Sequence, residues 1–224
     1  MSVVVVDYGS GNLRSAARAC ERAARDRAHW VRRMFWRYWP TVRVKISGSA
    51  EDVRAASRIV LPGQGAFGDC KRGLAAVPGM IEALDEAVIK SGRPFLGICV
   101  GMQLMAERGL EHGVHQGLGW LPGDCVAMTP TDKSLKIPHM GWNELFDLAP
   151  HPMLKGLKAG CHAYFVHSYV VRCAEPRHVL ASCDYGGPFA AIVSRGNMVG
   201  TQFHVEKSQA TGLTLIGNFL KWRP

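Results

Sequence analysis

Residues 94–103 read PFLGICVGMQ, and this stretch decides the fold class. The apolar run over 94–99 predicts a buried strand, and a helix is expected directly after it, over 101–108, with no linker between them. Gly97 and Gly101 stand two positions either side of Cys99, a spacing that allows a tight strand-to-helix turn. Such a turn holds a nucleophile at its apex, where flanking side chains would clash.

Working outward, strands and helices alternate through the first half of the chain, and strands dominate the second half. The expected strands cover 3–6, 58–61, 120–128, 162–171, 179–185, 189–194 and 198–204. The expected helices cover 13–28, 80–90 and 210–222. This order predicts one α/β domain over 1–224, with a mixed, mostly parallel central sheet, helices on both faces and added antiparallel strands.

Composition excludes several classes of protein. Hydrophobic residues make up 47% and charged residues 20%, a balance typical of a folded globular chain rather than a disordered one. The apolar runs are too short to cross a bilayer, and the first residues lack the features of a signal peptide, so we expect a cytoplasmic protein with no membrane partner. Seven cysteines without a C-x-x-C pair, and His112 and His115 without further ligands in register, predict neither disulfides nor a metal site.

The basic excess is concentrated in one segment. The net charge is +9, and residues 14–45 alone hold ten Lys/Arg against two Asp/Glu. Within it, residues 25–45 (RDRAHWVRRMFWRYWPTVRVK) carry three of the six tryptophans. Interleaved arginines and aromatics are found in nucleic-acid and anionic-membrane patches. No helical period separates the charges from the aromatics here, so we favour an atypical insertion-like segment and expect no nucleic-acid partner.

Two further motifs supply what a cysteine nucleophile needs. In residues 200–208, GTQFHVEKS, His204 can take the thiol proton and Glu206, two positions on, can orient the imidazole. In residues 61–65, LPGQG, glycines at a strand end let backbone N–H groups turn inward and form an oxyanion hole with the amide of Val100. The strand ends at Gly63, Cys99 and His204 are expected to meet at one edge of the sheet. An open α/β fold has its active site at such an edge.

GICVGMQ, PGQGAF and TQFHVEKS together resemble the class I (triad) glutamine amidotransferases. DYGSGNL, IPHMGWNEL and YFVHSY narrow the resemblance to the glutaminase subunits of imidazole glycerol phosphate synthases. The resemblance covers nearly the whole chain except about residues 25–45. It implies the three-layer fold of class I glutamine amidotransferases and no cofactor.

The resemblance also implies roles for individual residues. Cys99 attacks the side-chain amide of glutamine to give a thioester, His204 moves protons, and Glu206 orients the imidazole of His204. The implied oxyanion-hole residues are Gly63, Gln64 and Val100, and the implied glutamine-binding residues are Gly65, Gln103, Glu111, His167, Ser168 and Tyr169. In the family the oxyanion strand rests in an inactive orientation until the partner is loaded, which predicts a switch at the Gly63–Gln64 peptide.

The partner that the resemblance implies is a (β/α)₈ cyclase subunit, which uses the ammonia to make imidazole glycerol phosphate and aminoimidazole carboxamide ribotide in histidine biosynthesis. The implied interface residues are Asn12, Pro138, Met140 and Trp142, the last three on a loop beside the ammonia passage.

Two departures accompany the resemblance. Val205 stands where the family usually has proline, and residues 25–45 replace a short helix-to-strand passage. The alternatives are a catalytically weak or silent stabilising subunit of the same complex, and a triad amidotransferase that serves another synthase.

Overall fold

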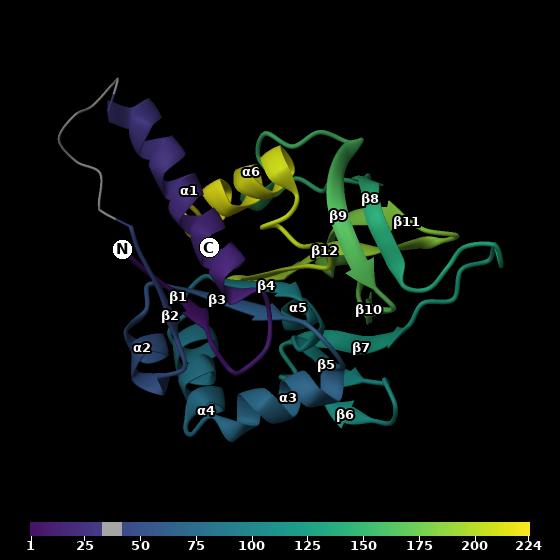
Figure 1. Ribbon diagram of the computed structural model, residues 1–224, viewed down its shortest axis with the longest axis horizontal. Coiled ribbons are helices and arrows are strands. Elements are labelled where there is room, and N and C mark those ends of the chain that lie inside the picture. Colours follow the sequence, from purple (N-terminus) through teal and green to yellow (C-terminus); the bar gives the residue numbers. More distant parts are fainter. Residues whose placement is uncertain (33–41) are drawn as a thin grey trace.

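The structure, a computed structural model, describes residues 1–32 and 42–224 (Figure 1). Its centre is a seven-stranded sheet in the order β11-β12-β13-β4-β3-β1-β2. These strands are β1 (Ser2–Val6), β2 (Arg43–Ser47), β3 (Arg58–Gly63), β4 (Phe95–Cys99), β11 (Val179–Asp184), β12 (Pro188–Arg195) and β13 (Met198–Thr201). Strands β2, β1, β3, β4 and β13 run parallel, and β12 and β11 continue the sheet antiparallel. The predicted fold class is confirmed.

The parallel strands read as continuous apolar runs because both of their faces are covered. Every residue of β3 and β4 is buried, as are Val3–Val6 of β1. Helices α1 (Leu13–Arg32) and α6 (Gln209–Phe219) pack against each other on one side of the sheet. Helices α2 (Ala50–Ala55), α3 (Phe67–Ala76) and α4 (Met80–Leu84), followed by η1 (Asp85–Lys90), lie on the other side (Figure 1).

Two smaller sheets lie at the carboxyl end of the parallel strands. One has the order β10-β7-β5-β6, and the other is the antiparallel pair β8-β9. Their strands are β5 (Ala106–Gly109), β6 (His115–Gln116), β7 (Leu121–Ala127), β8 (His139–Leu145), β9 (Cys161–His167) and β10 (Tyr169–Cys173). The remaining elements are the helix α5 (Val100–Gln103) and the short 3₁₀ turns η2 (Pro152–Leu154) and η3 (Pro176–His178).

The helix expected over 80–90 is confirmed, as α4 continued by the π-helical turn η1 from Asp85. Two other predicted elements were wrong. The helix expected over 101–108 is only the single turn α5, because the carbonyl of Met105 accepts the amides of Trp120 and Leu121 and so draws the chain into β5. The strand expected over 162–171 divides at Ser168 into β9 and β10.

Two corrections concern segments that carry site residues. The segment predicted to be an interface loop is mostly strand β8, which begins at His139. The strand predicted to reach His204 ends at Thr201, so His204 lies in the turn that follows β13. Of the Arg/Trp-rich segment over 25–45, residues 25–32 end helix α1 and residues 43–45 begin strand β2, while residues 33–41 lie outside the described residues. In the part of the chain that is described, no helix has the length and apolarity to span a membrane.

Candidate active site

Cys99 sits at a strained junction between β4 and α5. Its backbone has φ 55° and ψ −112°, a conformation that a non-glycine residue adopts only where the surroundings enforce it. The flanking glycines provide the room, since a Cβ on Gly97 would lie 2.6 Å from the carbonyl oxygen of Gly101, and a Cβ on Gly101 would lie 1.8 Å from that of Leu61. The predicted elbow is therefore present, and it directs the Cys99 thiol to the carboxyl edge of the sheet.

His204 and Glu206 form a buried pair beside this thiol. His204 Nδ1 lies 2.9 Å from Glu206 Oε1, and the two side chains are 4% and 1% exposed. The turn is held by the amide of His204, which donates to Tyr164 O, and by Ser208 Oγ, which donates to His204 O. Burial by itself lowers the pKa of His204, but the interactions with Cys99 and Glu206 outweigh it and raise the pKa to about 9.

The turn over 63–65 at the end of β3, which is predicted to form part of the oxyanion hole and is called the oxyanion turn below, is hydrogen-bonded to the β1–α1 loop. Gln64 N donates to Ser10 Oγ at 3.1 Å, and Ser10 Oγ donates to Gln64 O at 2.6 Å. Cys70 Sγ lies 3.3 Å from the same carbonyl and donates to it. The Gln64 amide is therefore engaged by Ser10, which leaves it unavailable to a bound oxyanion in this conformation.

A cavity of about 450 Å³ opens in front of Cys99. It collects most of the residues that the sequence singled out, together with Tyr164, Val166 and Lys207. The predicted residues that line it are Gln64, Gly65, Cys99, Val100, Gln103, Glu111, Pro138, Met140, His167, Ser168, Tyr169 and His204. Gly63, Glu206, Asn12 and Trp142 are not part of this lining. Asn12 instead lies behind His204, where its Nδ2 is 3.5 Å from Glu206 Oε1.

Two polar side chains in the cavity have defined partners. Glu111 Oε2 accepts the amide of Phe67 at 2.7 Å, at the N-terminal end of α3, which leaves Oε1 to meet a cationic group. Gln103 Nε2 donates to Tyr169 O at 3.1 Å and to Gln202 Oε1 at 3.2 Å. Both Nε2 protons are thus used, so Gln103 offers only its carbonyl oxygen to a ligand.

Sequence reasoning missed Gln202 and Ser10. Gln202 is fully buried, and its Nε2 donates to Cys99 Sγ at 3.8 Å. Its place two residues before His204 in TQFHVEKS was the available signal. Ser10 belongs to the quoted DYGSGNL segment, but only the folded chain places it against Gln64.

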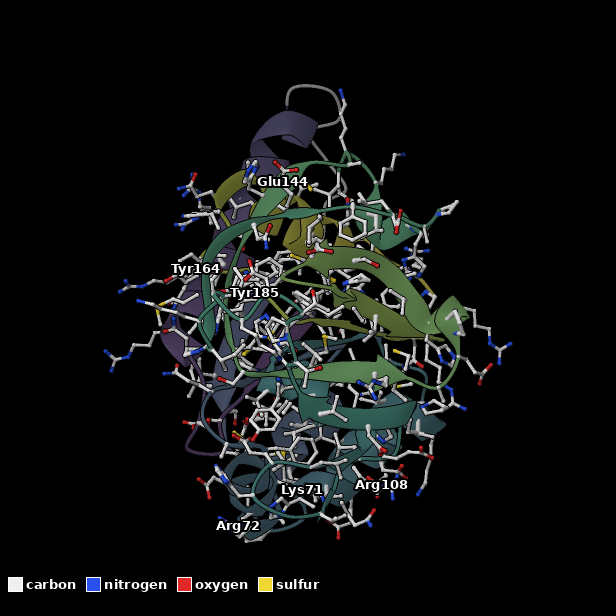
Figure 2. The ribbon with its side chains drawn as sticks, turned by 90° about the vertical axis from the view of Figure 1, so that its right-hand side faces the viewer. Lys71, Arg72, Arg108, Glu144, Tyr164 and Tyr185 are labelled. Atoms are coloured by element: carbon white, nitrogen blue, oxygen red, sulfur yellow. The ribbon has the colours of Figure 1, made fainter. Side chains whose placement is uncertain are left out.

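An apolar face lies beside the cavity on the β8-β9 pair. Met140 and Trp142 are 63% and 47% exposed, and the Trp142 ring meets the Tyr164 ring edge to face with centroids 5.8 Å apart. Figure 2 looks onto this side of the molecule, with Tyr164 and Glu144 in its upper half and Arg108 in its lower half. Exposed aromatic and Met side chains beside a cavity are typical of a protein-binding surface.

Over residues 1–25 and 42–224, whose side chains the structure describes, no three His, Cys, Asp or Glu side chains gather into a group that could hold a metal ion. The seven cysteines are all free thiols.

Comparison with known proteins gives consistent results. The chain is 54% identical over 225 residues to "Imidazole glycerol phosphate synthase subunit HisH" of Rhodospirillum rubrum, and 55% identical over 227 residues to the protein of that name from Brucella suis, with 100% of each chain covered in both comparisons.

Two solved structures share the fold. One, "Crystal structure of glutamine amidotransferase", has a TM-score of 0.69 at 18% identity and covers 97% of both chains. The other, the glutaminase domain of Trypanosoma brucei CTPS with bound acivicin, has a TM-score of 0.65 at 15% identity and covers 99% of this chain and 91% of that one.

The sequence pattern of one family, described as "Glutamine amidotransferase class-I", matches residues 4–222. With that match over almost its whole length, the chain belongs to the class I glutamine amidotransferase family.

Proposed function

We propose that this chain is the glutaminase subunit of an imidazole glycerol phosphate synthase, which hydrolyses glutamine to glutamate and ammonia for use in histidine biosynthesis. The observation that carries the proposal is one cavity in which a strained cysteine faces a histidine that is hydrogen-bonded to a buried glutamate. The full-length similarity to HisH subunits supports the choice among amidotransferases.

In this reaction His204 takes the thiol proton of Cys99 on Nε2, because Nδ1 is held by Glu206. The Cys99 sulfur then attacks the amide carbon of the glutamine side chain. His204 returns the proton to the leaving nitrogen, so ammonia departs and a thioester remains on Cys99. Water, deprotonated by His204, attacks the thioester, and glutamate leaves with the thiol restored.

The polar groups of the cavity fit the ends of glutamine. Glu111 Oε1 and the Gln103 carbonyl oxygen are acceptors for the α-ammonium group. The amide of Val100, at the first turn of α5, is one donor for the developing oxyanion. The Gln64 amide becomes the second donor only when the Gly63–Gln64 peptide turns away from Ser10. Its present orientation is that of a resting enzyme.

A partner subunit fits the exposed face beside the cavity. Met140 and Pro138 line the cavity mouth, and Met140 and Trp142 leave a large apolar area in solvent. We assign this face to the (β/α)₈ cyclase subunit, which would cover the apolar side chains and receive the ammonia as it leaves Cys99. Asn12, the other implied interface residue, contacts Glu206 rather than this face.

The test is glutamate release from glutamine by the purified chain, alone and with a cyclase subunit loaded with its nucleotide ligand. We expect release that rises on addition of the loaded cyclase and is lost in Cys99→Ala. Cys161→Ala is the matched control, because Cys161 is also a free thiol but stands at the opposite end of β9 from His167. Its activity should equal that of the wild type.

Two outcomes would refute the proposal. Binding to the cyclase without any glutamate release would indicate a silent stabilising subunit. Release of glutamate that does not respond to this cyclase would indicate an amidotransferase for another synthase.

A further inference from the structure

A chain of polar side chains runs from β8 to the cavity, and the orientation of its first member is fixed. Asn143 Nδ2 donates to Asp184 O at 2.8 Å, while Asn143 Oδ1 accepts the amide of Glu144 at 2.8 Å. These two contacts determine which end of the carboxamide is nitrogen. The second Nδ2 proton therefore points to His139 Nε2, 3.2 Å away.

The direction of every later hydrogen bond follows from that nitrogen. Because a carboxamide nitrogen only donates, His139 Nε2 accepts, and the His139 proton is on Nδ1. His139 Nδ1 lies 3.0 Å from His167 Nε2 and donates to it. His167 then carries its own proton on Nδ1 and donates to Tyr169 O at 3.0 Å. Both rings are neutral Nδ1–H tautomers.

The surroundings of the two rings favour this neutral state. His139 and His167 are 2% and 6% exposed, and the His139 ring is stacked between Phe165 and Tyr185 at centroid distances of 4.9 and 4.1 Å. Burial lowers the pKa of His139 to about 4 and that of His167 to about 3. The tautomers derived from the hydrogen-bond pattern are thus those of uncharged imidazoles.

The far end of this series of hydrogen-bonded side chains contacts the residues that would bind glutamine. Tyr169 O accepts from His167 Nδ1 and also from Gln103 Nε2. Gln103 is oriented by that carbonyl together with Gln202 Oε1, so its own carbonyl oxygen is left for a ligand. Since His167 has no nitrogen free, the ring of this predicted glutamine-binding residue does not bind glutamine through a nitrogen.

We propose that His139 is a positioning residue for glutamine binding, which acts through His167 to hold the Tyr169 carbonyl and the Gln103 carboxamide in the orientation that receives the substrate. The inference rests on the proposed glutaminase function and adds to it a residue that does not line the cavity. It makes the inner face of β8 part of the substrate site, while the outer face carries Met140 and Trp142.

Two substitutions at His139 separate positioning from packing. His139→Phe keeps a ring between Phe165 and Tyr185 but removes the donor to His167. His139→Asn removes the ring but keeps an amide nitrogen close to the place of Nδ1. Each variant is compared with wild type for kcat and for the glutamine KM, with saturating loaded cyclase, and for its thermal unfolding midpoint.

We expect His139→Phe to raise the glutamine KM about tenfold, as loss of one buried hydrogen bond in the site would, with kcat changed by less than about threefold. His139→Asn should return the KM to within about threefold of wild type despite a lower unfolding midpoint. His167→Phe should raise the KM as much as the double variant His139→Phe/His167→Phe, because His139 acts only through His167.

A purely structural role for His139 predicts the reverse order, with His139→Asn the more impaired variant, and that result would overturn the inference. Additive effects of the two phenylalanine substitutions would overturn it as well. If the wild-type chain itself shows no cyclase-stimulated glutamate release, the proposed function has failed instead, and the two failures are thereby distinguished.

A direct measurement covers the case in which His139→Phe does not fold. Two-bond ¹H–¹⁵N correlation spectra of the ¹⁵N-labelled wild-type chain report the tautomer of each of its nine histidines. We expect His139 and His167, assigned through His139→Asn and His167→Asn, to be Nδ1–H tautomers at neutral pH. An Nε2–H tautomer at His167 would break the chain of donors and refute the proposal.

Discussion

In the proposed mechanism Ser10 holds the oxyanion turn in its resting orientation, so Ser10→Ala should raise the glutaminase activity of the chain in the absence of its partner. The hydroxyl accepts the Gln64 amide at 3.1 Å and donates to the Gln64 carbonyl at 2.6 Å. In the active orientation the amide faces the oxyanion, and the first of these bonds is absent. The substitution therefore destabilises the resting orientation more than the active one.

The magnitude follows from the first contact, because the Gln64 carbonyl belongs to the next peptide and is not part of the peptide that turns. A typical hydrogen bond contributes a net 0.5–1.5 kcal/mol, or about 2–13-fold in the equilibrium between orientations. Ser10 is only half-buried and Cys70 still donates to the Gln64 carbonyl in the variant, which places the expected effect within this range. We expect about a fivefold increase in the basal rate of glutamate release.

The assay is glutamate release with and without the loaded cyclase, at saturating glutamine. In Ser10→Ala the fully stimulated rate should equal that of wild type, so the stimulation factor falls about as much as the basal rate rises. Ser10→Thr, which keeps a hydroxyl, is the control and should retain a low basal rate. A basal rate in Ser10→Ala equal to or below that of wild type would refute the assignment of Ser10 as the residue that holds the resting turn.

Three further predictions concern the triad and the elbow. Glu206→Gln should lower kcat about 100-fold or more. The pKa of His204 is raised from 6.5 to about 9 in the folded chain, so the stabilisation that His204 gains is complete below about pH 6.5 and is lost as pH rises through about 9. The difference in unfolding free energy between wild type and Glu206→Gln should therefore shrink between these two pH values. Glu144→Gln, at an exposed position, is the control. Val205→Pro should leave kcat within about twofold, because His204 and Glu206 are already 2.9 Å apart, and a large loss of activity would contradict this. It should raise the free energy of unfolding by about 0.4–1 kcal/mol, because the Val205 amide bonds to no described residue. Gly101→Ala should lower the free energy of unfolding by about 3 kcal/mol in urea titrations, since its Cβ would meet Leu61 O, whereas Gly217→Ala in α6, with open space around it, should not be destabilising.

The sequence by itself determined the central sheet, apart from its edge strand β2, and the position of the nucleophile. Strands β1, β3 and β4 are buried on both faces, so their apolar runs are visible without any knowledge of neighbours. The glycines around Cys99 are visible for a related reason, because a backbone carbonyl stands where their side chains would be. Burial on both faces and the need for glycine are local requirements, so they can be recognised from a few consecutive residues.

Only the tertiary structure decided the elements whose partners come from elsewhere in the chain. The residues after Gln103 have helical composition, yet the bonds from Trp120 and Leu121 to Met105 O draw them into a strand. The PHMGWN segment contains turn-forming residues, but pairing with β9 makes most of it strand β8 and turns His139 inward. The contacts of Ser10 with Gln64, of Gln202 with Cys99 and of His139 with His167 join residues 28 to 103 positions apart. A hydrogen bond forms only when donor and acceptor come within about 3.5 Å in a suitable direction. For residues far apart in the sequence, the fold sets that distance, and the neighbouring residues in the sequence do not.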